Sequence, residues 1–172
     1  MEVYRVTKDS PEWLFKVYDY ARTDAFCFGQ GIPVNFEYGH DEPIDDTYQA
    51  VVLVDEGKPV AGCKITYPGK NVARIARVCV TREYQHKGAG SILIKEAEKW
   101  ILEGEVSKIV INSQNRAQKF YEKLGYELVP GVDPRIIEER PDGDYSSAPR
   151  DYAPSNNKLG FFCVLLEKNV PA

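Results

Sequence analysis

Hydrophobic and polar residues follow two kinds of pattern along the chain. Segments in which apolar residues alternate or form short runs predict strands, and segments in which they recur every three or four positions predict helices. The expected strands are residues 2–7, 48–54, 59–67, 71–80, 108–111, 126–129 and 160–166. The expected helices are residues 11–28, 90–102 and 116–124, the first ending before Gly29 and the last capped by Gly125.

The strand at 71–80 carries apolar residues on both of its faces. Ala76, Val78 and Val80 share one face, and Ile75 and Cys79 lie on the other. The end of such a strand is expected to be buried on both sides. The element order is strand, helix, antiparallel strands and then β-α-β-α-β-β, which predicts an α+β protein with a mixed sheet.

The length of 172 residues is enough for one domain with a full core, so we expect a single domain over residues 1–172. An irregular excursion lies at about residues 130–158, where five prolines stand among acids, serines and asparagines. It could be a lid, a dimer contact or an idle surface loop. A homodimer through the last strands is left open.

Charge, apolar content and cysteine spacing exclude several classes of protein. A formal net charge of −4 argues against a nucleic-acid binder. No apolar run reaches the roughly 20 residues that span a membrane, and the first residues lack the order of a secretory signal. Three of the four cysteines (Cys63, Cys79 and Cys163) lie in apolar runs and none forms a CxxC pair, which predicts buried free thiols in a cytoplasmic protein.

The segment REYQHKGAGSILI, residues 82–94, places a glycine-rich loop between a strand and a helix. The first N–H groups of a helix lack intrahelical partners and lie at the positive end of its dipole, so they suit an anion such as a pyrophosphate. Gly88 and Gly90 allow close approach because they have no Cβ. The alternative is that the two glycines only turn the chain. The segment lacks the P-loop pattern, and Leu93 stands where a dinucleotide fingerprint requires its third glycine.

Two motifs give the central part of the chain, residues 73–129, a resemblance to a known family. Gln85-x-x-Gly88-x-Gly90 resembles the acyl-CoA loop of the GNAT N-acyltransferase superfamily. One helix and one strand later, residues 114–126 resemble the second GNAT motif, in which a polar residue and a small one precede Phe-Tyr and Gly-Tyr. Residues 21–46 are similar to a subgroup of small bacterial GNAT proteins of unassigned substrate, although Gly29 stands where an acid is usual.

This resemblance implies a fold and a set of binding residues. The fold is a single α+β domain with a mixed, mostly antiparallel sheet of about 6–7 strands and about four helices. The backbone of the strand end would run beside the pantetheine arm of acetyl-CoA, the loop would bind its pyrophosphate, and Gln114 would hydrogen-bond the arm. The implied cofactor-binding residues are Val78, Cys79, Val80, Gln85, His86, Lys87, Gly88, Ala89, Gly90, Ser91 and Gln114.

Tyr121 matches the tyrosine that in this family lies near the sulfur, where a phenol can protonate the leaving thiolate. The alternative is that Tyr121 packs in the core beside Phe120. Cys79 could act as a covalent nucleophile, but no histidine is placed to activate it, so an inert thiol is favoured.

The general base is left open. Glu37, Asp41, Asp45 and Asp46 are candidates, with solvated surface as the alternative for each. Glu37, Asp45 and Asp46 are also predicted to bind the substrate, because an acidic stretch complements a cationic amine. His40 among scattered acids does not make a metal site, and no metal is expected.

The resemblance therefore predicts an acetyltransferase that moves an acetyl group from acetyl-CoA to a primary amine of a small molecule by direct transfer. No nucleic-acid or membrane partner is expected. The alternatives are a non-catalytic acyl-CoA sensor and an acyl-homoserine-lactone-type synthase.

Overall fold

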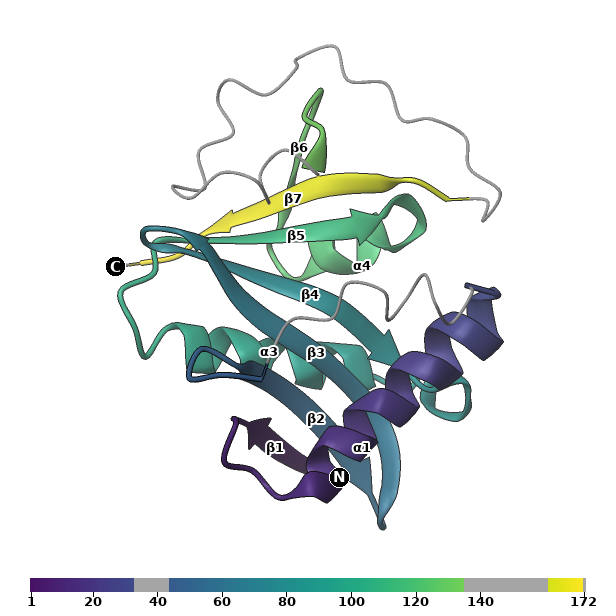
Figure 1. Cartoon of the computed structure of the whole chain (residues 1–172). Coiled ribbons are helices and arrows are strands. Elements are labelled where there is room, and N and C mark those ends of the chain that lie inside the picture. Colours follow the sequence, from purple (N-terminus) through teal and green to yellow (C-terminus); the bar gives the residue numbers. More distant parts are fainter. Residues whose placement is uncertain (33–43, 135–160, 172) are drawn as a thin grey trace. The chain divides into compact units, whose positions relative to one another are not determined.

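The computed structural model describes residues 1–32, 44–134 and 161–171 (Figure 1). Seven strands form one sheet in the order β1-β2-β3-β4-β5-β7-β6. The strands are β1 (Glu2–Val6), β2 (Gln49–Asp55), β3 (Lys58–Gly69), β4 (Val72–Val80), β5 (Lys108–Gln114), β6 (Glu127–Val129) and β7 (Cys163–Asn169). The α-helices within the described ranges are α1 (Glu12–Arg22), α3 (Ala89–Ile101) and α4 (Gln118–Lys123).

The sheet is mixed and mostly antiparallel, as predicted. The pairs β1–β2, β2–β3, β5–β7 and β6–β7 are antiparallel, and β4–β5 is parallel. The seven strands lie within the expected number, while the described residues hold three α-helices rather than about four. The α+β class is therefore confirmed.

The contacts divide the chain into two compact units, which are described separately. The first unit comprises Met1–Thr66 and Ala76–Trp100, and the second comprises Tyr67–Ile75 and Ile101–Ala172. The prediction of a single domain over the whole chain stays a prediction.

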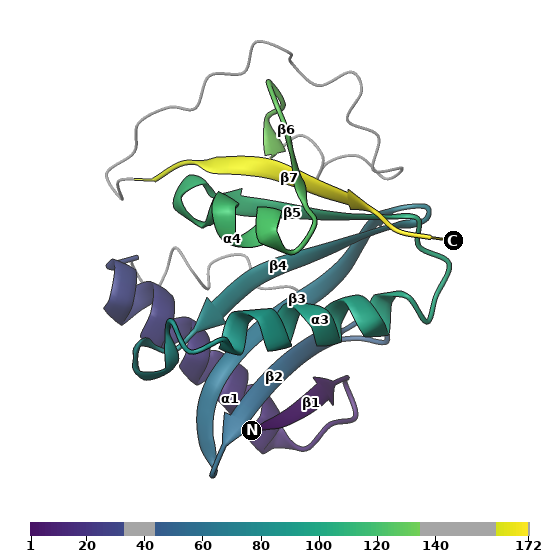
Figure 2. The same ribbon diagram turned by 180° about the vertical axis from the view of Figure 1, so that it is seen from behind.

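In the first unit, α1 lies on one face of β2 and β3, and α3 lies on the other (Figures 1 and 2). This explains the continuous apolar run of β2, whose five central residues are all buried. The ring of Tyr18 lies so close over Gly62 of β3 that a Cβ there would approach its Cδ1 atom to 2.5 Å. On the other face, Arg5 of β1 forms an ion pair with Glu96 of α3 at 3.0 Å.

The first helix is longer than predicted. After α1 the chain forms a π-helical segment (Thr23–Phe28) and remains helical through residue 30. Gly29 keeps right-handed helical geometry, and Gly31, with φ +73°, is the left-handed residue that ends the helix. The prediction was wrong because the sequence contains two glycines near the helix end, and only backbone geometry distinguishes their roles.

The second unit is built around β5. Its whole length pairs with β7, while its pairing with β4 covers three residue pairs, Val72–Arg74 with Lys108–Val110. Val72, Val110 and Leu165 form a buried cluster there. Gly125, with φ +97°, follows α4 as predicted, and Lys168 Nζ donates a hydrogen bond to the Leu124 carbonyl at 2.9 Å.

The last strand begins and ends three residues later than predicted, at Cys163–Asn169 instead of 160–166. The apolar pattern placed Phe161 and Phe162 in the strand. The bounds of the strand are instead set by backbone pairing with β5, which begins at Cys163. The polar end of β7 is held by an ion pair between Lys108 and Glu167 at 3.4 Å.

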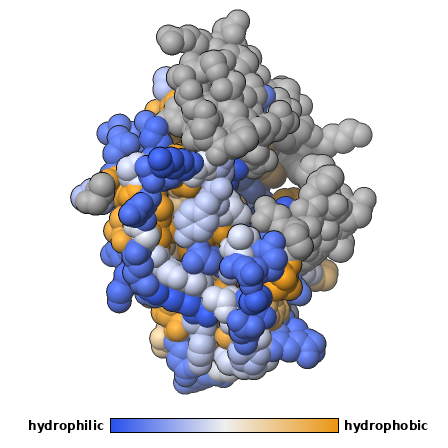
Figure 3. All heavy atoms as spheres, turned by 60° about the vertical axis from the view of Figure 1, so that its left-hand side comes forward, coloured by the Kyte–Doolittle hydropathy of each residue, from blue (hydrophilic) through white to orange (hydrophobic). Residues whose placement is uncertain are grey.

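Exposed apolar residues are spread between polar ones. The face in Figure 3 is mainly hydrophilic and is interrupted by smaller hydrophobic areas. Several of the exposed aromatic side chains belong to the first helix, namely Trp13, Tyr20 and Phe28. Scattered exposed apolar side chains are normal on a folded protein, so they do not by themselves indicate a binding surface.

Candidate active site

The end of β4 has an irregular backbone and is partly exposed. Arg77 has φ +52°, a left-handed conformation that interrupts the alternation of a strand. Beyond it Val78 and Val80 are half-buried, whereas Cys79 is buried. The predicted burial of both faces is therefore wrong at this end. The half-buried Val78 and Val80 leave this end of the strand partly accessible to solvent.

The glycine loop that follows contains two left-handed residues. His86 has φ +63° and Gly88 has φ +85°, with Lys87 between them. Successive residues of opposite handedness direct neighbouring N–H groups into a common concavity that favours anions. No heavy atom lies within 4 Å of the position that a Cβ on Gly88 would occupy.

The loop leads directly into α3. The Ile92 N–H donates to the Gly88 carbonyl at 3.4 Å, so the helical hydrogen bonding begins there. The N–H groups of Ala89, Gly90 and Ser91 precede this bond and belong to the first turn, whose amides have no carbonyl one turn earlier in the helix. The predicted anion-binding residues are thus brought together in one short turn at the positive end of a helix.

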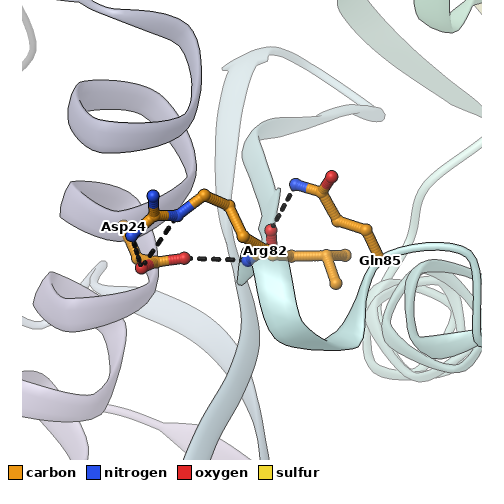
Figure 4. Close-up of polar contacts among 4 residues, drawn as sticks. Asp24, Arg82 and Gln85 are labelled. Carbon is orange, nitrogen blue, oxygen red and sulfur yellow. Dashed lines mark hydrogen bonds and ion pairs between the residues drawn. The ribbon is translucent and has the colours of Figure 1, made fainter.

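Four contacts brace this loop, and the first three involve Tyr84, Gln85 and Lys87. The Gln85 side chain donates from Nε2 to the Val80 carbonyl at 3.1 Å, so Gln85 stabilises the loop itself (Figure 4). The Tyr84 hydroxyl donates to Asp55 Oδ2 at 3.0 Å, and partial burial together with this hydrogen bond raises the pKa of Tyr84. Lys87 Nζ lies 5.6 Å from the centre of the Tyr84 ring.

The fourth brace joins Arg82 to the first helix. Asp24 accepts hydrogen bonds from the Arg82 backbone N–H at 2.8 Å, from its Nη2 at 3.0 Å and from its Nε at 3.3 Å (Figure 4). Partial burial alone would raise the pKa of Asp24, but the hydrogen bonds and positive charge of Arg82 lower it below its ordinary value. The carboxylate therefore remains ionised at neutral pH.

A hollow of about 500 Å³ lies beside this brace in the first unit. Its lining residues are Tyr20, Asp24, Lys58, Pro59, Thr81, Arg82 and Glu83. The charges in it are matched, because Asp24 pairs with Arg82 and Lys58 pairs with Glu83 at 3.6 Å. We therefore interpret the hollow as surface beside the loop and not as a separate binding site.

The contacts that brace the loop were not predicted from the sequence. Asp24 and Arg82 are 58 residues apart, and no motif connects them. The only available signal was the basic residue immediately before the loop motif, which is too common to single out. Gln85 was predicted to bind the cofactor, but its side-chain amide is directed at Val80.

The second unit holds the other predicted residues. The Gln114 side-chain oxygen accepts a hydrogen bond from Arg116 Nε at 2.9 Å. Tyr121 is only 5% exposed, and its ring forms edge-on contacts with Phe120 and Tyr126, whose centroids lie 5.0 and 6.1 Å away. This packing matches the core alternative, but it does not test a catalytic role for the hydroxyl.

The predicted substrate-binding acids have local partners where they are described. Asp45 accepts hydrogen bonds from the Thr47 hydroxyl at 2.6 Å and the Thr47 N–H at 2.9 Å, and these bonds lower its pKa. Asp46 forms an ion pair with Lys8. Glu37, His40 and Asp41 lie outside the described residues, as does most of the excursion.

The cysteines are all free thiols. Cys79 donates from Sγ to the Gly62 carbonyl at 3.4 Å, and burial raises the pKa of Cys63 to about 12. Both observations favour inert thiols. The expectation of burial was wrong for Cys163, which is half-buried because it begins the last strand.

The described residues hold neither a cluster of metal ligands nor a membrane-spanning helix. Within those ranges, no three His, Cys, Asp or Glu side chains lie close enough together to hold a metal ion. No helix described here is long and apolar enough to cross a membrane.

The sequence also matches the model of a known protein family, and the match includes the loop. Residues 9–126 match the model of the acetyltransferase (GNAT) family. The chain belongs to this family. It is therefore a GNAT-type N-acetyltransferase, an enzyme that moves an acyl group from acyl-CoA to an amine.

Similar proteins agree with this assignment. YjcF of Bacillus subtilis, an uncharacterized N-acetyltransferase, is 27% identical over 110 residues, which are 64% of this GNAT chain and 76% of YjcF. The structure of ElaA from Escherichia coli has a TM-score of 0.71 at 14% identity and covers 98% of this chain and 99% of its own. A PaiA N-acetyltransferase from Thermoplasma acidophilum, solved with coenzyme A, has a TM-score of 0.62 at 14% identity, with 99% and 100% covered. At these identities the solved structures show a shared fold.

Proposed function

We propose that this GNAT protein transfers an acetyl group from acetyl-CoA directly to a primary amine of a small molecule. The observation that carries the proposal is the braced loop at 85–91, which combines two left-handed residues with the first turn of α3. Such a loop suits a diphosphate because several amides and the helix dipole favour the same anion.

The end of β4 is proposed to hold the pantetheine arm. Its backbone has a left-handed residue at Arg77, and Val78 and Val80 are only half-buried. An extended arm that carries amides can pair with such a segment in the manner of an added strand. A main-chain N–H of residues 78–80 would then polarise the thioester carbonyl, and this type of interaction is often the largest catalytic contribution.

The reaction requires two proton movements. The amine nitrogen forms a bond to the acetyl carbon, and the bond from that carbon to sulfur breaks. The sulfur leaves with the bonding electron pair and takes a proton, which we assign to the Tyr121 hydroxyl by its place in the GNAT motif. The proton lost by the amine goes to a base, for which Glu37, Asp41, Asp45 and Asp46 are the candidates. Gln114 is proposed to orient the arm.

The test is a thiol-release assay of the purified protein with acetyl-CoA and a panel of amines. We expect release that depends on one class of amine. Tyr121→Phe should lower kcat by about 100-fold, the lower range for general acid catalysis, with little change in KM for acetyl-CoA. Tyr126→Phe removes a hydroxyl from the same aromatic cluster and serves as the matched control. Equal losses in both variants would assign Tyr121 to packing, and an unchanged Tyr121→Phe would remove it from the mechanism.

The acceptor is proposed to be a cationic amine, because residues 37–46 are acidic. Asp46 is one of the two described acids of residues 37–46, and its side chain is 83% exposed. Asp46→Asn should raise KM for the active amine without changing KM for acetyl-CoA. Glu12→Gln, which removes an exposed acid from α1, is the matched control. Unchanged acceptor KM values in Asp46→Asn and Asp45→Asn would contradict this acceptor class.

A further inference from the structure

Arg82 is the point at which the end of β4 becomes the anion-binding loop. It lies two residues after the last residue of β4 and three before Gln85. Its backbone N–H and its guanidinium both donate to one carboxylate, that of Asp24. A single side chain therefore fixes both the main chain and the side chain of the residue that leads into the loop.

Two further residues of the helix that carries Asp24 contact Arg82. The π-helical segment ends at Phe28, whose ring centre lies 5.9 Å from the guanidinium carbon. A Cβ on Gly29 would lie 3.4 Å from Arg82 Cγ, so Gly29 packs closely against the arginine stem. We call the contacts of Asp24, Phe28 and Gly29 with Arg82 the Arg82 anchor.

The two partners differ in their exposure to solvent. The side chain of Asp24 is 14% exposed and that of Arg82 is 56% exposed. A mostly buried carboxylate needs its hydrogen-bond donors, and here Arg82 supplies them from its backbone and its side chain. The anchor thus ties an exposed loop to a buried point on the first helix.

The loop needs such a constraint because its conformation is strained. His86 is a non-glycine residue with φ +63°, a conformation that costs on the order of 1 kcal/mol and persists only where its surroundings impose it. Amides that are already arranged for an anion bind it without a further ordering cost. If the attachment at Arg82 is released, the loop can relax and its amides diverge.

We propose that Asp24 is a positioning residue for the diphosphate of acyl-CoA and acts through Arg82. This inference rests on the proposed function of the loop at 85–91. Asp24 does not contact the ligand in this proposal. It holds the chain so that the amides of residues 86–91 converge.

The experiment compares two donors. S-acetylpantetheine ends before the diphosphate, whereas acetyl-CoA includes it. Asp24→Ala should weaken CoA binding about tenfold by calorimetry, which corresponds to the loss of roughly one good charged hydrogen bond. It should raise KM for acetyl-CoA with little change in kcat, so kcat/KM for acetyl-CoA falls. The value of kcat/KM for S-acetylpantetheine should stay within about twofold of the wild-type value.

Two further variants refine the test. Asp24→Asn keeps an oxygen that can accept a hydrogen bond from the Arg82 backbone N–H, so its affinity for CoA should lie between those of the wild type and Asp24→Ala. It replaces Asp24→Ala in the test if that variant does not fold. Glu12→Ala removes an exposed acid from the same helix and should bind CoA like the wild type.

The outcomes separate the inference from the proposed function. A wild-type protein that binds no CoA overturns the proposed function and the inference with it. If the wild type binds CoA and Asp24→Ala and Asp24→Asn bind it equally well, only the inference fails. Equal losses for both donors would show that Asp24 supports the fold in general, and this result also overturns the inference.

Discussion

At the scale of single residues, two glycines of the first unit are required for different reasons. Gly88 has a left-handed backbone and open space around its missing Cβ, whereas Gly62 lies directly under the ring of Tyr18. The first position constrains the backbone and the second constrains packing. Substitution at each should therefore affect a different property of the protein.

Gly88→Ala should cost about 1–2 kcal/mol of unfolding free energy, the usual penalty for a left-handed L-residue, and should weaken CoA binding. Gly62→Ala should cost more, because its Cβ would lie 2.5 Å from a ring carbon in the core. Urea unfolding and calorimetric titration with CoA measure both effects. A Gly62→Ala protein as stable as the wild type would contradict the packing argument.

The glycine motif was predictable because its residues are adjacent and have one shared geometric requirement. The partners of Arg82 and Tyr84 were not predictable, because Asp24 and Asp55 precede them by 58 and 29 residues. Contacts of this kind depend on which elements pack together, and the local pattern of the sequence does not contain that information.

At the scale of elements, helix and strand types followed from periodicity, while their ends did not. The π-helical segment extended the first helix beyond Gly29, and pairing with β5 moved the last strand toward the C-terminus. The left-handed backbone of Gly31 ends the first helix, and pairing with β5 sets the bounds of the last strand. The Arg82 anchor holds the π-helical part of the first helix, and its contribution to stability depends on pH.

The folded-state pKa of Asp24 is lower than its ordinary value, so the unfolded chain binds the proton more tightly. The stability from this carboxylate is therefore fully present above the ordinary pKa of about 3.9 and is lost as pH falls through the folded value. Asp24→Asn should be less stable than the wild type at pH 7, and the difference should shrink below about pH 4. Urea unfolding across this range measures the difference, and a gap that widens in acid would contradict the assignment.

At the scale of the whole molecule, two strands belong to both compact units. β3 passes from the first unit to the second after Thr66, and β4 passes back after Ile75. When one unit opens, it releases one end of a strand whose other end is held in the second compact unit. Covalent continuity of this kind predicts that the two units unfold together.

Leu165→Ala, in the buried cluster of the second unit, tests this coupling. A fully buried leucine replaced by alanine typically costs about 2–5 kcal/mol. The thermal transition should stay single and shift to lower temperature, and the amides of β2 in the first unit should exchange faster with solvent. Unchanged exchange in β2, together with a second transition, would show that the units unfold separately.

The hydrogen bond from the Arg82 main chain to Asp24 has a consequence for sequence variation. Any amino acid except one retains a backbone donor at position 82, so much of the attachment is independent of the arginine side chain. Proline alone lacks that donor. In a saturation library selected for acetyl transfer, position 82 should tolerate many replacements and exclude the one residue whose ring nitrogen carries no hydrogen.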